Sequence, residues 1–345
     1  MFLKIRKRLE KELAAFIREL DKEYSLSRIS PLLFKSIREF VLRKGKRIRP
    51  ALFAIGYLGY ARKPAANLYR SAVSLELLHD FLLVHDDIID KSSTRRGRPS
   101  MHGLMDDYLK GRRNLKFTGQ DLAIVAGDVI YAMAIHAFLA VRADRQRKEA
   151  ALKKLLEAVL YTGSGEFLEL ILSLKPIEHI SKNDIYKIYD LKTAKYTFSI
   201  PLVMGATLAG AKPEELRKLY HYGIYLGRAF QIRDDILGTF AEEKNTGKSE
   251  LTDLKEAKKT ILLWQAFRRS NHEDRAVIKR ILNLKNAGRP ELKKMRTIIS
   301  SSGALGFAQN EISRLAKKAQ VINSSLGMKK EYRQSLKEFS AKIFA

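Results

Sequence analysis

The chain has no cysteine among its 345 residues, so it forms no disulfide and offers no thiolate as a metal ligand or nucleophile. Strand-like alternation of polar and apolar residues is scarce, and there is no low-complexity linker or short-period repeat. The basic start of the chain also lacks the unbroken apolar core of a signal peptide. These absences favour a cytoplasmic, all-α protein, and we predict a single large helical domain over residues 1–345.

One apolar run, residues 123–141, is long enough to cross a bilayer. It contains Asp128 and His136, and a carboxylate at the bilayer centre costs about 3 kcal/mol. We therefore expect this run to be a buried helix of a large water-soluble protein.

The sequence is strongly basic, with a formal net charge of +27. Such a charge is typical of proteins that bind nucleic acid, anionic membranes or anionic substrates, but a merely basic surface is an equal alternative. No zinc-ligand spacing and no aromatic RNA-binding signature accompanies the basic residues, so nucleic acid is not predicted as a partner. A basic surface could still hold the protein peripherally at an anionic membrane.

Helical periodicity dominates the chain, for example in the leucines of residues 68–82. Two polar segments, 91–120 and 238–253, interrupt the helices, and each directly follows an acidic motif. We expect both segments to be loops that close over a site. Pro50 or Pro64 fits the first turn of a helix, where a missing amide proton does no harm.

The first acidic motif, residues 85–90, reads HDDIID. Asp86 and Asp90 are four residues apart, so a helix places both carboxylates on one face, and His79 lies nearly two turns earlier on the same stripe. Unpaired carboxylates are costly among apolar neighbours, so we expect a divalent cation between them, and oxygen ligands favour magnesium. The alternative is an exposed acidic end of a helix.

A second acidic motif, residues 230–238, reads FQIRDDILG and contains Asp234 and Asp235. Two such motifs facing each other would form a cage for several magnesium ions and the phosphates that they bridge. Arginine and lysine suit phosphate oxygens. A solvated surface charge is the commoner interpretation of any single basic residue, so the prediction depends on their joint occurrence around two aspartate pairs. The basic residues around the motifs include Lys46, Arg47, Arg49, Arg95, Arg96, Arg98, Lys192, Lys248, Lys258 and Lys259.

Between about residues 46 and 259, seven segments in order resemble the trans-isoprenyl diphosphate synthases, also called polyprenyl synthetases. The segments read GKRIRP, LELLHDFLLVHDDIID, RRGRPSMH, AGDVIYA, KTAKYTF, FQIRDDILG, and TGK followed by DLKEAKKT. The resemblance implies an all-α fold around a deep central cavity, and a homodimer. It also implies an enzyme that condenses isopentenyl diphosphate with an allylic diphosphate (dimethylallyl, geranyl or farnesyl) and requires magnesium.

The same resemblance implies roles for individual residues. Asp86 and Asp90 would bind two magnesium ions, and Asp234 would bind a third. Asp87 would support the first motif, with Gln231 and Asp235 near the third ion. The residues that contact the allylic diphosphate would be Arg95, Lys192, Lys248 and Lys258. Those that contact isopentenyl diphosphate would be Lys46, Arg49, His79 and Arg96. The residues that stabilise the carbocation would be Thr193 and Gln231.

Two features bear on the product and on the metal. Phe81 and Leu82 precede the first motif where, by resemblance, a bulky residue limits chain growth, which indicates geranylgeranyl diphosphate (C20) as the product. The alternatives are that Phe81 is ordinary core packing and that the product is farnesyl (C15) or longer. Gly238 stands where many family members carry an aspartate, so a third ion would depend on Asp234 and water.

Three other functions compete with this prediction. A terpene cyclase or a head-to-head condensing enzyme shares the fold and the metal chemistry. Lys46, Arg49 and Arg96 argue against this alternative, because a cyclase binds no second diphosphate. A non-catalytic subunit of a synthase would lack aspartates of the motifs, and Gly238 is the single candidate loss. A basic scaffold for nucleic acid would leave the aspartate pairs unexplained.

Overall fold

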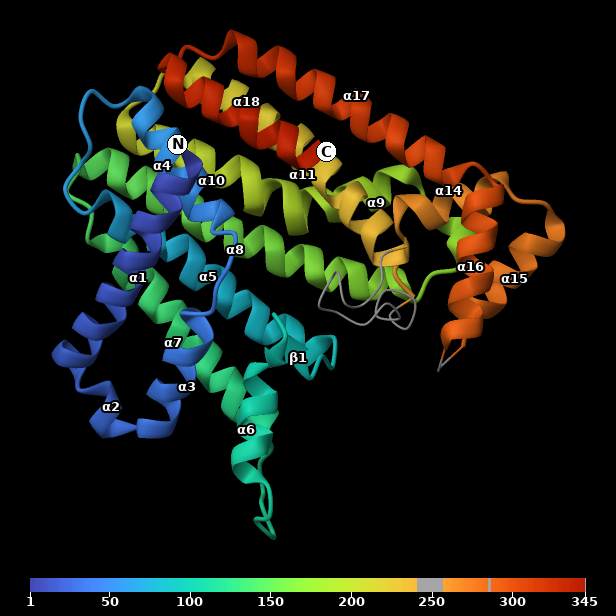
Figure 1. The fold of residues 1–345 in the computed structure, drawn as a ribbon, viewed down its shortest axis with the longest axis horizontal. Coiled ribbons are helices and arrows are strands. Elements are labelled where there is room, and N and C mark those ends of the chain that lie inside the picture. Colours follow the sequence, from blue (N-terminus) through green and yellow to red (C-terminus); the bar gives the residue numbers. More distant parts are fainter. Residues whose placement is uncertain (241–256, 285–286, 345) are drawn as a thin grey trace. The chain divides into compact units, whose positions relative to one another are not determined.

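The computed structural model describes residues 1–240, 257–284 and 287–344, which form helices joined by mostly short connections (Figure 1). The chain divides into two compact units, unit 1 with residues 1–155 and 204–211, and unit 2 with residues 156–203 and 212–345. Two of the boundaries fall within α8 (Arg145–Ser173) and α10 (Ile200–Ala209), and the third, after residue 211, follows the end of α10. The all-α prediction is confirmed, whereas one domain over the whole chain stays a prediction.

Unit 1 is organised around α5 (Leu68–Ile89), which packs against α1, α4 and α7. Its first half is buried on nearly every side, as its run of leucines, valine and alanine requires. The other elements of unit 1 are α1 (Phe2–Tyr24), α2 (Leu26–Ile29), α3 (Pro31–Val41), α4 (Ile48–Tyr60), β1 (Thr94–Arg95), β2 (Arg98–Pro99), α6 (Met101–Leu109) and α7 (Gly119–Leu139).

The apolar run predicted as a buried helix lies in α7, which packs against α5 and α6. The side chain of Thr118 accepts a hydrogen bond from the amide of Asp121 at 3.4 Å and starts the helix with a capping box. Among the described residues, α7 alone is long and apolar enough to cross a membrane, and 44% of its most apolar window is buried in the protein. The packing on α5 and the exposed Asp128 fit a core helix of a globular unit.

The prediction of a loop over residues 91–120 is wrong in part. The antiparallel hairpin β1–β2 and helix α6 lie within it. Met101, Met105 and Leu109 bury one face of α6 at helical spacing, which the polar composition of the segment concealed. In the second segment, residues 238–240 continue α11 (Pro213–Phe240), and residues 241–253 lie outside the described residues.

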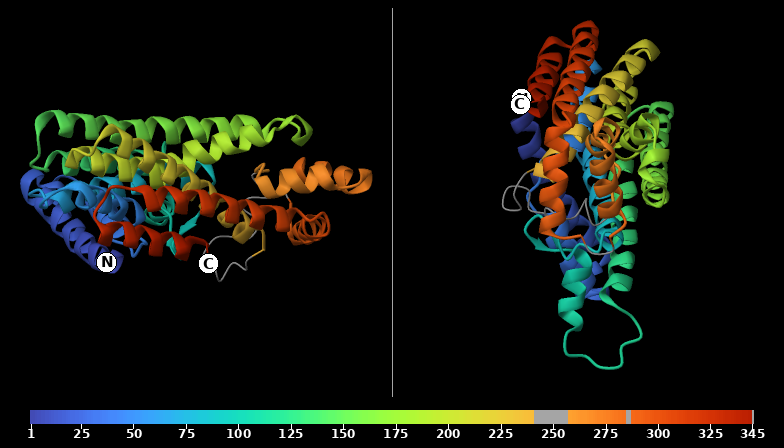
Figure 2. Two further views of the ribbon diagram at one scale, coloured as in Figure 1. Left: turned by 90° about the horizontal axis from the view of Figure 1, so that it is seen from above. Right: turned by 90° about the vertical axis from the view of Figure 1, so that its right-hand side faces the viewer.

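Unit 2 is organised around α11, which packs against α17 and the π-helix η2 (Tyr189–Ser199). Helices α17 and α18 run side by side (Figures 1 and 2). The remaining elements of unit 2 are η1 (Ile177–His179), α9 (Lys182–Ile188), α14 (Ile261–Arg269), α15 (His272–Leu282), α16 (Arg289–Ser301), α17 (Ala304–Ser325) and α18 (Lys330–Phe344).

Two glycines on one face of α11 let η2 approach its backbone. A Cβ added at Gly227 would lie 2.3 Å from Cα of Ala194, and one added at Gly223 would lie 2.3 Å from Cα of Ser199. Real Cβ atoms do not come so close to a backbone atom, so any side chain at these positions would force the two helices apart.

We therefore expect Gly227→Ala to lower the free energy of unfolding by about 1–3 kcal/mol, since the added methyl overpacks the contact with η2. Gly306→Ala is the matched control. Gly306 is exposed on α17, with nothing within 4 Å of an added Cβ. There alanine should stabilise the helix by up to about 1 kcal/mol. Urea unfolding of both variants measures the difference, and equal stability would contradict the close packing.

Candidate active site

The first aspartate motif lies at the end of α5 in unit 1, and its two metal-ligand candidates share one face. An oxygen of Asp86 and one of Asp90 lie within 4.8 Å of each other, and both side chains are half-buried. Asp87 points the other way and is fully buried. This difference follows from the helix, because successive side chains are about 100° apart.

Arg95, from β1, holds the first motif together. Its Nε donates to Asp87 Oδ1 at 2.7 Å and its Nη2 donates to Asp86 Oδ2 at 3.1 Å. Burial alone would lower the pKa of Arg95, but the three aspartates of the motif raise it above its usual value. The guanidinium is therefore a permanent charge beside the carboxylates, placed there by the tight hairpin β1–β2.

The residues predicted to bind isopentenyl diphosphate also lie in unit 1, around the start of α4 and the middle of α5. Lys46 is exposed, whereas Arg49, His79 and Arg96 are half-buried. Burial and the neighbouring arginines, Arg49 first among them, lower the pKa of His79 well below its ordinary value. His79 is therefore a neutral imidazole at neutral pH, able to donate a hydrogen bond without adding charge.

Two buried carboxylates on α5 lie beneath these basic residues. Glu76 accepts a hydrogen bond from Arg47 Nη1 at 2.5 Å, and both side chains are almost fully buried. Arg96 Nη2 lies 3.7 Å from Glu76 and 3.8 Å from Asp80. Burial, and then the charge of Glu76, raise the pKa of Asp80 well above its usual range, against the lowering effect of Arg96 and Arg47. Glu76 therefore fixes Arg47 in place through the hydrogen bond at 2.5 Å.

The second aspartate motif lies near the end of α11 in unit 2 and repeats the pattern of the first. Asp234 is exposed, and Asp235 is buried. Asp235 accepts hydrogen bonds from the hydroxyl of Tyr189 and from Gln231 Nε2, the latter at 3.0 Å. Thr193 Oγ1 in turn donates to Gln231 Oε1 at 2.6 Å. One buried aspartate therefore orients both residues predicted to stabilise the carbocation.

Lys192, predicted to contact the allylic diphosphate, lies on the π-helix η2 and is held by two acids of α8. Its Nζ lies 2.6 Å from Glu166 Oε2 and also donates to Glu169. Burial alone would lower the pKa of Lys192, but Glu169 and Glu166 raise it, so the ammonium group stays charged. π-Helical segments are rare and are frequent at functional sites.

Three further residues singled out in the sequence belong to unit 2. Lys258 is half-buried just before α14, and Lys248 lies outside the described residues. Gly238 is half-buried in α11, one turn after Asp234, and adds no ligand there. Asp234 is thus the accessible carboxylate of the second motif.

Phe81 and Leu82, the predicted chain-length residues, are half-buried on α5, one turn before the first motif. The Phe81 ring centroid lies 4.7 Å from that of His85 and 5.2 Å from that of Tyr131 on α7. The Phe81 side chain is therefore held in place by two other rings.

Comparison with known proteins decides the family. The polyprenyl synthetase family model matches residues 30–299. The chain belongs to this family. It is 30% identical over 314 residues to the geranylgeranyl diphosphate synthase of Sulfolobus acidocaldarius, covering 89% of this chain and 88% of that protein. It is 31% identical over 280 residues to the octaprenyl diphosphate synthase of Escherichia coli, covering 80% and 78%.

A solved polyprenyl synthetase shares the fold. The structure of geranylgeranyl pyrophosphate synthase from Corynebacterium glutamicum, complexed with isoprenyl diphosphate and magnesium, is 27% identical, with a TM-score of 0.90 over 99% of this chain and 98% of that chain. The predictions of the isoprenoid synthase fold and of a prenyltransferase enzyme are confirmed. The two relatives named above differ in the length of product that their names state, so family membership alone does not fix this length.

The donor set of this polyprenyl synthetase fits a divalent cation. Asp86 and Asp90 present hard carboxylate oxygens close together, as magnesium and calcium prefer. Asp86 also accepts a hydrogen bond from a cationic group, the guanidinium of Arg95. The accessible Asp234 offers the same chemistry in unit 2.

Sequence reasoning missed the acidic partners of the basic residues. Four such acids were not predicted as functional. Glu76 and Asp80 lie within 4 Å of Arg96, and Glu76 also binds the buried Arg47. Glu166 and Glu169 lie within 4 Å of Lys192. The available signal was spacing. Glu76 and Asp80 are four residues apart on α5, and Glu166 and Glu169 are three residues apart on α8. Residues at these spacings lie on the same side of a helix.

Proposed function

We propose that this polyprenyl synthetase condenses isopentenyl diphosphate with an allylic diphosphate in a magnesium-dependent reaction, with geranylgeranyl diphosphate (C20) as the main product. One observation carries the proposal. In both motifs the first aspartate is accessible and the second is buried and hydrogen-bonded. This arrangement suits one ligand and one supporting residue in each aspartate pair, with Asp90 as a further ligand in the first motif.

Asp86 and Asp90 would hold two magnesium ions and Asp234 a third. When bound, these ions would neutralise negative charge on the leaving diphosphate, as metal ions do in such displacements. Asp87 keeps Arg95 charged and directed at Asp86, and Lys192 is kept charged by Glu166 and Glu169. Both cations are thus preorganised for a diphosphate, so little reorganisation is needed as the carbon–oxygen bond breaks.

The reaction balances without a dedicated side-chain base. The allylic carbon–oxygen bond breaks, and the departing diphosphate takes the electron pair. The double bond of isopentenyl diphosphate then forms the new carbon–carbon bond, and the proton that is lost goes to the departing diphosphate. Thr193 and Gln231 present oxygen dipoles to the allylic cation, held by Asp235.

Lys46, Arg49, His79 and Arg96 would bind the diphosphate of isopentenyl diphosphate. The neutral His79 donates a hydrogen bond, while the arginines supply charge and forked donors. A terpene cyclase needs no such second diphosphate group, so this cluster favours a condensing enzyme.

Replacing Phe81 by alanine tests the proposed limit on product length. We expect Phe81→Ala to shift the main product beyond C20, because removing the ring opens space beside Leu82 and Tyr131. Mass spectrometry of the products measures the shift. Tyr108→Ala is the control, since its ring is exposed on α6. Unchanged product length in Phe81→Ala would contradict the role of Phe81 and leave it as core packing.

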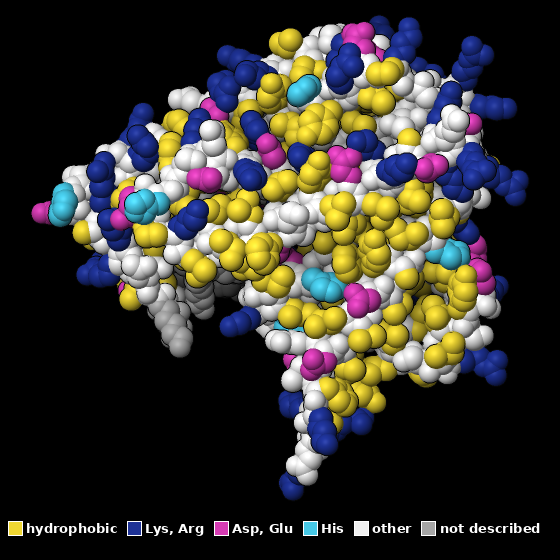
Figure 3. Space-filling model, turned by 180° about the vertical axis from the view of Figure 1, so that it is seen from behind, with side chains coloured by type: hydrophobic (Ala, Val, Ile, Leu, Met, Phe, Trp, Pro, Cys, Tyr) yellow, Lys and Arg dark blue, Asp and Glu magenta, His cyan; other side chains and the backbone are white. Residues whose placement is uncertain are grey.

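We further propose that the enzyme is a homodimer. A stripe of apolar side chains is exposed along α8, including Leu160 at 69% and Phe167 at 68%. Figure 3 shows hydrophobic side chains exposed over a broad area of the face that it views. Exposed apolar stripes of this kind mark interfaces. Sedimentation should give twice the chain mass of 39.4 kDa, and a monomer at micromolar concentration would contradict the proposal.

The proposed enzyme is cytoplasmic, and its net charge of +27 supports peripheral attraction to anionic membranes. Incubation of the protein with isopentenyl diphosphate and each allylic primer, with magnesium or with EDTA, tests the reaction. We expect elongation with magnesium only. Elongation in EDTA would contradict the metal dependence, and an absence of elongation under both conditions would favour a cyclase or a non-catalytic subunit.

A further inference from the structure

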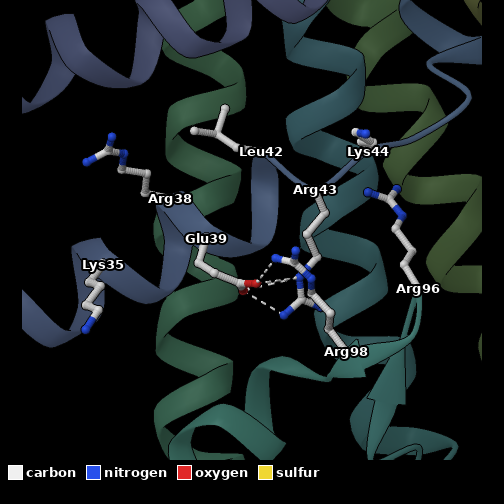
Figure 4. Close-up of a pocket in the computed structure, with 8 residues that line it drawn as sticks. All are labelled: Lys35, Arg38, Glu39, Leu42, Arg43, Lys44, Arg96 and Arg98. Carbon is white, nitrogen blue, oxygen red and sulfur yellow. Dashed lines mark hydrogen bonds and ion pairs between the residues drawn. The ribbon is translucent and has the colours of Figure 1, made fainter.

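Unit 1 contains a strongly basic pocket that none of the predicted roles explains (Figure 4). Its volume is about 700 Å³, and it is formed by α3, the connection after α3, and the β1–β2 hairpin. The residues that line it are Lys35, Arg38, Glu39, Leu42, Arg43, Lys44, Arg96 and Arg98. Of these, only Arg96 also belongs to the group predicted to bind isopentenyl diphosphate.

The pocket has a large excess of positive charge. Six of its lining side chains are cationic and one is acidic, so its net charge is +5. The single acid, Glu39, accepts hydrogen bonds from Arg43 Nη2 at 2.6 Å and from Arg98 Nη1 at 3.0 Å. Burial would raise the pKa of Glu39, but the hydrogen bonds from these arginines lower it below its usual value, so it is ionised.

Three cations of the pocket have no partner in the part of the chain that the structure describes. The side chains of Lys35, Arg38 and Lys44 are exposed and make no hydrogen bond or ion pair with a described residue. In Figure 4, Lys35 and Arg38 extend from α3 on the side of Glu39 that faces away from Arg43 and Arg98. Like charges at this density repel one another, and a concave surface focuses their field on an anion.

The geometry favours a phosphate group over other anions. Arg43 is buried and fixed, because Glu39 binds one side of its guanidinium and its Nη1 donates to the carbonyl of Arg95 at 3.3 Å. Fixed and mobile guanidinium groups together match the several oxygens of a phosphate. Leu42 is the one apolar lining residue, so the pocket offers no space suited to a prenyl chain.

We propose that this pocket is an additional binding site for a phosphate or diphosphate group, distinct from the residues assigned to the two substrates except for the shared Arg96. The group could be a free diphosphate or the phosphate of an anionic lipid. Because Arg96 is shared, a ligand in the pocket and isopentenyl diphosphate should alter each other's affinity by the same factor.

Titration calorimetry with inorganic diphosphate in EDTA tests whether the ligand is a free diphosphate. EDTA removes divalent cations and so prevents metal-dependent binding at the aspartate motifs. The variant is K35Q/R38Q, and the matched control is K7Q/K11Q, which removes the same charge from exposed positions of α1 in the same unit. We expect the wild type and the control to bind one more diphosphate per chain than K35Q/R38Q, or to bind it at least about 10-fold more tightly.

This difference does not depend on the proposed reaction. If the predicted isopentenyl diphosphate site is also real, the wild type binds two diphosphates and K35Q/R38Q binds one. If the predicted isopentenyl diphosphate site does not exist, the wild type binds one diphosphate and K35Q/R38Q binds none. Thermal unfolding of each variant confirms that the fold is intact, which the exposure of all four side chains leads us to expect.

Sedimentation with vesicles of phosphatidylcholine and phosphatidylglycerol tests whether the ligand is the phosphate of an anionic lipid. Selective loss of vesicle binding in K35Q/R38Q, but not in K7Q/K11Q, would identify a lipid headgroup as the ligand. Selective loss of diphosphate binding alone would identify a free diphosphate. If K35Q/R38Q and K7Q/K11Q behave alike with both probes, the pocket is no phosphate site and the proposal is overturned.

Discussion

Asp86→Asn should lower kcat by about 10³-fold, because it removes a charged ligand at the point where negative charge develops in the transition state. Asparagine keeps the shape of the side chain but binds a divalent cation weakly. Asp86 is half-buried and its neighbour Asp87 retains Arg95 through the hydrogen bond at 2.7 Å, so the fold should survive the change.

Steady-state assays over a range of magnesium concentrations measure this effect. We expect the loss to be reduced, but not abolished, at high magnesium. Asp107→Asn on α6 is the matched control in the same unit, since Asp107 is exposed. An activity of Asp86→Asn within 10-fold of the control would contradict the assignment of Asp86 as a metal ligand.

Arg47→Met should lower the free energy of unfolding by about 3–5 kcal/mol, the usual effect of breaking a buried ion pair from one side. The side chains of Arg47 and Glu76 are only 3% and 4% exposed, and Arg47 Nη2 also donates to the carbonyl of Arg43 at 2.6 Å. Its loss would leave the buried charge of Glu76 near Asp80 with only the longer contact to Arg96 at 3.7 Å.

Urea unfolding of three variants separates this cause from general damage. The double variant R47M/E76Q should recover part of the lost stability, because it removes the stranded charge. Lys153→Met, in the exposed pair with Glu149, should leave stability unchanged. If R47M/E76Q is no more stable than Arg47→Met, the buried charge is not the cause.

The helices and the aspartate motifs could be predicted from the sequence because their signals are local. Apolar periodicity identifies α5, and a spacing of four places Asp86 and Asp90 on one face of it. Their metal-binding role remains a prediction. Helix α6 was missed because the polar residues of the segment around it outweighed three buried residues at helical spacing.

The partners that set the charges could not be predicted, because they lie far apart in the sequence. Arg47 and Glu76 are 29 residues apart, and Lys192 and Glu169 are 23 residues apart. A single sequence shows which residues are charged, but tertiary packing decides which charges meet. The basic pocket was hidden for the same reason, since α3 and the hairpin contribute to it from separate segments.

The central claim is that one isopentenyl unit is added for each diphosphate released. Incubation of the protein with magnesium, farnesyl diphosphate and labelled isopentenyl diphosphate, with both products counted, tests it most directly. We predict one labelled unit incorporated per diphosphate released, and a C20 diphosphate as the main product. Diphosphate released without incorporated label would contradict the account and indicate cyclisation or hydrolysis of the allylic substrate.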